Sequence, residues 1–178
     1  MSKLIFLDNG ATSFPKPEEV YTYMDHFYRN FGVNPGRSGY DLCMEAGLVV
    51  EDTRKLLTEF FNGADPNRLC FGYNSTDALN LIISGLLKPG DHAVSTTVEH
   101  NSVLRPLYHL MRDGVAVDFV PFDRGGFVDP QEIRKRFRPN TRLVVVNHAS
   151  NVIGTVQPVA AIGRLCREAG VLFAIDAS

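Results

Sequence analysis

Asp176 ends the apolar run 171–175 and is the residue best suited to hold a positively charged ligand. A carboxylate at the end of a buried strand loses hydration, and only a cation or several hydrogen-bond donors can offset that loss. A protonated pyridine nitrogen would meet this need, because the carboxylate keeps the ring cationic. A structural salt bridge to one of the arginines is the competing explanation.

Ser75 and Thr76 begin a predicted helix just after the turn 72–74. Their hydroxyls and the unpaired N–H groups of the first helical turn can bind a phosphate. The simpler alternative is an ordinary helix cap, because Ser, Thr, Asn and Asp are the preferred capping residues. Taken alone, this segment favours the cap.

His100 and Asn151 follow two other apolar strands, at 92–97 and 142–147. The flat imidazole could lie against an aromatic ligand, or it could simply cap or solvate a helix start. The Asn amide can donate to a phenolic oxygen or to a carboxylate, although turns are also rich in Asn for backbone reasons. Neither residue alone assigns a function.

Strands and helices alternate from residue 68 to residue 176. This alternation predicts an α/β fold with right-handed crossovers, a mainly parallel sheet and helices on both faces. Ligands of such sheets bind at the carboxyl ends of the strands, so the four motifs should converge on one crevice. The strands are predicted at 68–73, 92–97, 115–121, 142–147 and 171–176, and the helices at 75–87, 101–113, 130–138 and 158–169.

Two more helices precede the alternating region. One is predicted at 18–30, and the other has apolar residues at helical spacing up to Phe60 and ends at Asn62 and Gly63. The segment 32–39 is rich in Pro and Gly and predicts an irregular loop. We therefore expect two parts: residues 1–40 form a helix and an active-site entrance loop, and residues 41–178 form an incomplete α/β domain.

The composition argues against several classes of function. The net charge is −2, which favours neither nucleic acid nor an anionic membrane, and the basic segment 134–138 fits a solvated helix surface. Neither an apolar span nor a secretory signal is evident, so we expect a cytoplasmic protein. The three cysteines are widely separated, which suggests neither disulfides nor a metal site.

The order of these motifs resembles that of the class V aminotransferases, a family of fold-type I pyridoxal phosphate enzymes. Within the family, the cysteine desulfurase and selenocysteine lyase group is the most similar. Each motif is weak by itself, but together they follow the family order over nearly the whole chain. The matching segments are 7–13, 34–39, 74–80, 88–91, 99–102, 148–154 and 174–177.

The resemblance implies that pyridoxal 5'-phosphate is the cofactor. Ser75, Thr76 and the adjacent backbone would hold its phosphate, and His100 would stack on the ring as the catalytic histidine. Asp176 would pair with the ring nitrogen. Asn151 would lie near the ring hydroxyl or the substrate carboxylate.

The resemblance also implies a substrate and partners. Ala11 and Thr12 would line the substrate entrance, with Asn151 near the substrate and Arg37 as a weaker candidate in a loop at a homodimer interface. The amino-acid substrate would be cysteine or selenocysteine, and a sulfur-acceptor protein is a further expected partner.

The family places its Schiff-base lysine after the aspartate, and no lysine follows Asp176 here. The substrate-binding arginine, the persulfide cysteine and the small carboxyl-terminal domain are also expected beyond this point. We therefore expect a truncated, amino-terminal portion of an enzyme that converts cysteine to alanine and enzyme-bound sulfur, inactive by itself. The alternatives are another class V aminotransferase, a selenocysteine lyase, or a catalytically dead fragment that acts as a binding module.

Overall fold

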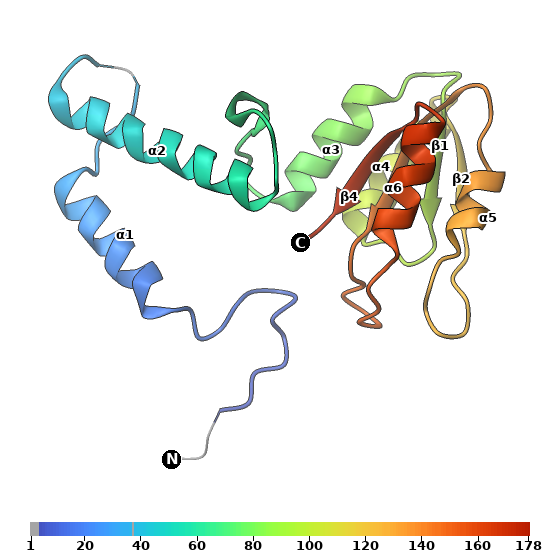
Figure 1. Ribbon diagram of the computed structural model, residues 1–178, viewed down its shortest axis with the longest axis horizontal. Helices are drawn as coiled ribbons and strands as arrows, with labels where there is room; N and C mark the ends of the chain where they lie inside the picture. Colours follow the sequence, from blue (N-terminus) through green and yellow to red (C-terminus); the bar gives the residue numbers. More distant parts are fainter. Residues whose placement is uncertain (1–3, 37) are drawn as a thin grey trace. The chain divides into compact units, whose positions relative to one another are not determined.

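The computed structural model describes residues 4–36 and 38–178 (Figure 1). The chain forms two compact units, Met1–Phe71 and Gly72–Ser178. The functional division that we expect near residue 40 stays a prediction. In the described part of the chain, no helix combines the length and the apolar character needed to cross a membrane.

The first unit is helical and contains α1 (Glu18–Asn30), α2 (Asp41–Phe60) and a short 3₁₀ helix, η1 (Pro66–Arg68). The predicted bounds of α1 are confirmed. The predicted end of α2 is also confirmed, because Asn62 adopts a φ of 55°, the left-handed conformation that commonly ends a helix.

The strand predicted at 68–73 is wrong. After η1 the chain has no regular structure up to α3, and Phe71 is exposed. The Leu69 carbonyl accepts a hydrogen bond from the Arg54 guanidinium, which also lies 4.9 Å from the centre of the Phe71 ring. The apolar run therefore contacts a side chain of α2 instead of a neighbouring strand, and a strand needs a ladder partner to form.

The second unit contains a sheet of four parallel strands in the order β2-β1-β3-β4, which confirms the predicted α/β fold (Figure 1). Helix α5 ends before the predicted residue 138, because Arg138 N–H donates to Thr141 Oγ1 in the turn before β3. The strands are β1 (His92–Thr96), β2 (Ala116–Val120), β3 (Thr141–Asn147) and β4 (Leu172–Asp176). The helices are α3 (Ser75–Leu86), α4 (Asn101–Arg112), α5 (Pro130–Lys135) and α6 (Val159–Glu168).

Helices cover both faces of this sheet, as the alternation predicts (Figure 1). Successive strand residues point to opposite faces, so neighbours along β1 and β3 enter different cores. The first core joins α3 and α4 to the sheet through Leu79, Ile83, Leu87, Ala93, Val103, Leu107, Val115, Leu143 and Val145. The second core joins α5 and α6 to the sheet through Val94, Val120, Val128, Ile133, Val144, Val146, Ile162 and Cys166.

His92 lies buried at the amino end of β1, with none of its surface exposed. Its Nδ1 is 2.8 Å from Thr141 Oγ1, and its Nε2 is 3.3 Å from the Asp118 carboxylate. Arg138 pairs with the same carboxylate at 2.7 Å. Burial lowers the pKa of His92 below 6.5, and the Arg138 charge lowers it further, against the opposing effect of Asp118.

The buried His92 should make the second unit sensitive to acid. Its pKa is lower in the folded chain than in the unfolded chain, so the unfolded chain binds the proton more tightly. The stability that the neutral ring contributes is present above pH 6.5 and is lost as the pH falls through the folded pKa. We expect this slope to disappear in His92→Asn, which keeps a polar group near Thr141.

Urea unfolding of the parent chain and of His92→Asn, between about pH 5 and about pH 8, measures the slope. His109→Asn is the matched control, because His109 is exposed on α4. Equal slopes in the parent and in His92→Asn would contradict the assignment.

Candidate functional site

Polar side chains meet at the carboxyl ends of β1, β3 and β4. Thr96 ends β1, and Asn147 of β3 pairs in register with Asp176 of β4. The helices α3 and α4 begin beside them, at Ser75 and after His100. The structure therefore brings elements of all four predicted motifs to one edge of one sheet, where ligands of parallel sheets bind.

Asp176 is a buried carboxylate with only 6% of its surface exposed. Its Oδ1 accepts hydrogen bonds from Ser75 Oγ at 3.3 Å, from Ser178 N at 3.2 Å and from Ser178 Oγ. Among the residues that the structure describes, no ion pair includes Asp176, so the alternative of a structural salt bridge does not hold for them. The carboxylate is thus held by neutral donors, and its charge is available to a cation.

The start of α3 is capped by Asn74, whose Oδ1 accepts from Asp77 N at 2.8 Å. The cap predicted for this segment is present, but it uses the residue before Ser75 and Thr76. Ser75 Oγ instead donates to Asp176, and Ser178 Oγ lies 3.2 Å from Ser75 Oγ. The Thr76 side chain is exposed on the first turn of α3, where a hydroxyl and unpaired N–H groups favour an anion.

His100 is the N-cap of α4, so the capping role considered for it is real. Ser102 N donates to Nδ1 at 3.2 Å, and Ser102 Oγ lies 2.8 Å from the same nitrogen. The neutral ring therefore carries its proton on Nε2. Both His100 and Thr76 line an open cavity of about 450 Å³ between α3 and α4. The structure thus brings together two residues that we predict to contact the cofactor.

Asn151 lies in the turn after β3 and is exposed. It is not among the described residues that line the cavity shared by Thr76 and His100. Within its loop, Ser150 Oγ accepts hydrogen bonds from the backbone N–H groups of the turn. At the end of the loop, the buried Gln157 donates to Gly126 O at 2.8 Å and accepts from Val128 N at 2.9 Å. The position of Asn151 therefore depends on a second loop, a contact that the local sequence does not indicate.

The predicted substrate residues belong to a different part of the chain. Ala11 N donates to Asp8 O at 3.1 Å, and Thr12 Oγ1 accepts from Lys16 Nζ at 3.3 Å, both within the first unit. Their role at the substrate entrance stays a prediction. Arg37 lies outside the described residues.

Glu99 is a site residue whose role the sequence motifs do not indicate. It is 8% exposed, and its Oε1 accepts from Thr96 Oγ1 at 2.6 Å and from Asn147 N at 3.1 Å. Burial raises the pKa of Glu99 to about 7, with a smaller contribution from the negative charge of Asp176 and against the lowering effect of the hydrogen bonds from Thr96 and Asn147. One feature of the sequence could have identified Glu99: it is an acidic residue between an apolar strand and His100. A charge at such a position costs free energy if the position is buried.

Comparisons with known proteins agree with this arrangement. The sequence model of the family described as aminotransferase class-V matches residues 5–178. A protein named probable cysteine desulfurase, from Methanothermobacter thermautotrophicus, is 35% identical over 175 residues, which are 98% of this chain and 43% of the relative. Cysteine desulfurase IscS of Clostridium botulinum is 33% identical over 181 residues, with coverage of 99% and 45%.

Solved structures give the same result. The apo structure of the cysteine desulfurase from Thermococcus onnurineus NA1 matches with a TM-score of 0.89 and 31% identity, covering 96% of this chain and 43% of that one. This chain therefore spans less than half the length of these relatives. Its fold, its motif order and the family match over residues 5–178 agree, and the chain belongs to the class-V aminotransferase family.

Proposed function

We propose that this chain supplies the cofactor-holding portion of a pyridoxal phosphate-dependent cysteine desulfurase, an enzyme that takes cysteine to alanine and retains the sulfur. One observation carries the proposal: the Asp176 carboxylate is buried at the end of β4, and its described partners are neutral donors. Hydrogen bonds offset part of the cost of burying this charge, and a cation would offset more of it. The relatives named as cysteine desulfurases support the choice of reaction.

The residues at this edge fit the three parts of pyridoxal phosphate. A protonated ring nitrogen needs a carboxylate, and Asp176 offers one with its charge unpaired among the described residues. A phosphate needs donors, and Thr76 lies on the first turn of α3. A flat ring needs a flat neighbour, and the exposed His100 lines the same cavity as Thr76.

The chain's own groups then have distinct tasks. Asp176 holds a proton on the ring nitrogen, and Ser75 orients the carboxylate by donating to its Oδ1. Thr76 donates to the phosphate, and His100 covers the ring and keeps water from it. Asn151 donates to the ring hydroxyl or to the substrate carboxylate. When bound, pyridoxal phosphate supplies an electron sink for the amino-acid substrate.

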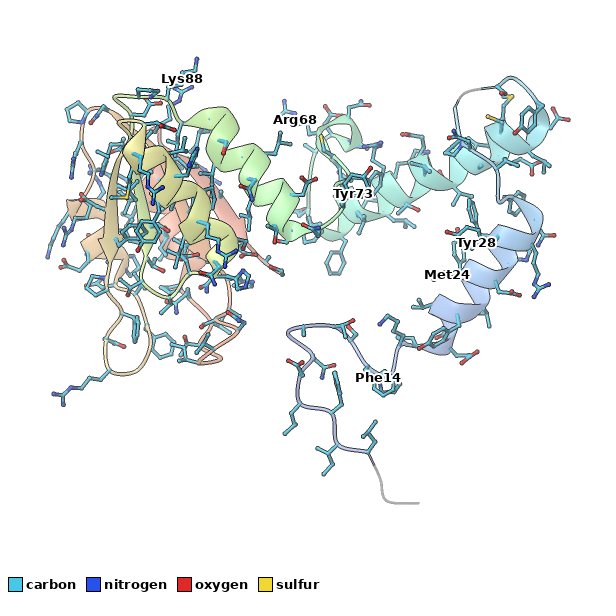
Figure 2. All side chains as sticks on the ribbon, turned by 180° about the vertical axis from the view of Figure 1, so that it is seen from behind. Phe14, Met24, Tyr28, Arg68, Tyr73 and Lys88 are labelled. Carbon is cyan, nitrogen blue, oxygen red and sulfur yellow. The ribbon has the colours of Figure 1, made fainter. Side chains whose placement is uncertain are left out.

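We further propose that Ala11, Thr12 and Arg37 guide the amino acid toward this edge, and that the enzyme is a homodimer. The exposed apolar surface of the first unit supports the association. Helix α1 buries none of its residues, and Figure 2 shows Met24 and Tyr28 projecting from it; they are 52% and 70% exposed. An apolar surface of this kind is typical of an interaction site.

The proposal predicts that Thr76→Val weakens the binding of pyridoxal phosphate by roughly 10-fold to 100-fold. The substitution keeps the side-chain volume but removes a donor to a charged phosphate, an interaction of about 1.5–3 kcal/mol. Equilibrium dialysis of the chain against pyridoxal phosphate measures the affinity. Thr76→Ser should restore it.

Thr22→Val is the control, because the Thr22 hydroxyl on α1 bonds only to its own helix backbone among the described partners. If Thr76→Val and Thr22→Val bind pyridoxal phosphate equally well, Thr76 does not hold the phosphate. If the parent chain shows no saturable binding, the proposed function itself fails.

A further inference from the structure

We propose that, on the acid side of neutral pH, Glu99 and Asp176 form a carboxyl pair with a single negative charge, in which Glu99 Oε2 keeps its proton and donates it to the side-chain carbonyl of Asn147. Asp176 is then the ionised member, and it faces the cationic ligand. The identity of that ligand rests on the proposed function, whereas the charge distribution in the pair does not.

The hydrogen bonds around Glu99 leave two buried oxygens without a donor. Glu99 Oε1 is satisfied by Thr96 Oγ1 and by Asn147 N. Glu99 Oε2 and Asn147 Oδ1 are both buried, and neither has a hydrogen-bond partner among the described residues. Asn147 Nδ2 donates to Val98 O at 2.7 Å, which identifies Oδ1 as the atom in need of a donor.

Protonation of Glu99 satisfies both oxygens at once. A carboxylate oxygen and an amide oxygen are both acceptors, so an ionised Glu99 would leave two buried acceptors unpaired. A proton on Oε2 turns one of them into a donor. Glu99 Oε1 already bonds to the backbone N–H of Asn147, and we therefore assign the side-chain carbonyl of Asn147 as the acceptor of that proton.

The surrounding charges place the proton on Glu99 and not on Asp176. Three hydrogen bonds reach Asp176 Oδ1 and stabilise its charge, whereas Glu99 has a donor on only one oxygen. Burial outweighs the two hydrogen bonds to Oε1 and, together with the smaller effect of the Asp176 charge, raises the pKa of Glu99 to about 7. Thr96 of β1 and Asn147 of β3 are neutral, and the adjacent His100 directs Nδ1 toward Ser102.

The pair has a consequence for the site. Two ionised carboxylates at this edge would repel each other, whereas one charge matches the single charge of a protonated ring nitrogen. Glu99 Oε1 also links the turn before α4 to the end of β3 by accepting from Asn147 N, and Asn147 Nδ2 makes a second link by donating to Val98 O. Glu99 is thus a positioning residue for His100 and sets the charge of the site.

Carbon-13 NMR of the glutamate side-chain carboxyls tests the pair in the chain without any cofactor. Glu99 should titrate with a midpoint near pH 7, the value that its surroundings produce, and Glu99→Gln should remove that signal. A midpoint near 4.5, its ordinary value, would overturn the proposal. Glu132→Gln is the control, because Glu132 is an acid on α5 that pairs with Lys135.

Two variants test the pair from different sides. Asp176→Asn should lower the Glu99 midpoint, because it removes the charge that raises it; an unchanged midpoint would show that the two groups are not coupled. Glu99→Gln should fold as the parent does, because the amide can accept and donate as the protonated acid does. A Glu99→Gln chain that does not fold would contradict a neutral Glu99.

The pH dependence of unfolding gives a second readout. The stability from neutral Glu99 is fully present below pH 4.5 and is lost as the pH rises through about 7. The difference corresponds to a change on the order of 300-fold in the unfolding equilibrium, and it should vanish in Glu99→Gln. If these titrations hold while pyridoxal phosphate fails to bind, the proposed function is wrong and the carboxyl pair stands.

Discussion

The Asp176→Asn chain should bind pyridoxal phosphate about 10-fold to 100-fold more weakly than the parent at neutral pH. The buried carboxylate is the group of this site that can pair with a protonated ring nitrogen, and an amide cannot replace its charge. The amide oxygen can still accept from Ser75 and from Ser178, so the fold should survive. The ring nitrogen should also lose much of its protonation, because its acid form is no longer stabilised.

Equilibrium dialysis measures the affinity, and the nitrogen-15 shift of labelled pyridoxal phosphate reports whether the bound ring nitrogen carries a proton. Asp113→Asn is a matched control that removes one negative charge from a more exposed position at the end of α4. A purely structural Asp176 would behave differently: its replacement would lower the stability of the free chain and leave the bound nitrogen protonated. Such a result would remove Asp176 from its proposed role.

The chain by itself should release no alanine from cysteine above the background of free pyridoxal phosphate. The reaction needs an amine base at the site, and the described lysines are engaged or distant. Figure 2 shows Lys88 at the opposite end of α3 from Tyr73. Lys16 bonds to Ser13 O at 3.0 Å, and Lys55 and Lys135 form ion pairs on their own helices.

The reaction also needs a reactive thiolate to take the sulfur. Cys43 and Cys166 are buried, and burial raises the pKa of the Cys166 thiol to about 11, so it stays protonated at neutral pH. The accessible thiol is Cys70, which lies in the irregular segment of the first unit instead of the strand expected there.

An assay of alanine and sulfide, with the purified chain and with free pyridoxal phosphate, measures the activity. Borohydride reduction followed by peptide mapping should label none of the five lysines stoichiometrically. Turnover well above background would contradict the prediction. Loss of that turnover in Cys70→Ser, but not in Cys166→Ser, would identify Cys70 as the sulfur-accepting residue.

Much of the fold could be predicted from local patterns. Helix α1 lies at its predicted residues after two prolines, and β1 to β4 lie within a residue of theirs, because each strand is a short, mainly apolar run between helices. The placement of the four motifs at one edge of the sheet also followed from the pattern, since the carboxyl ends of parallel strands meet there, but neither Asn151 nor Asp176 is among the described residues that line the cavity of Thr76 and His100. The roles of Thr76, His100, Asn151 and Asp176 stay predictions from the family resemblance.

The segment 68–73 shows the limit of such patterns. Its residues suit a strand, but a strand also needs a neighbour, and here Leu69 bonds to Arg54 instead. The cap of α3 shows the same limit on a smaller scale. Asn74, Ser75 and Thr76 are all preferred capping residues. Asn74 caps the helix, whereas the Ser75 hydroxyl bonds to Asp176, about a hundred residues away in sequence.

The sequence by itself determined the family, the α/β architecture and the edge of the sheet at which the polar groups meet. Only the tertiary structure decided the state of those groups. Glu99 is buried against Asn147 and lies in the field of Asp176, residues far from it along the chain. Desolvation and Coulomb interactions depend on distance in space, so a residue's charge follows from the strands packed around it and not from its neighbours in sequence.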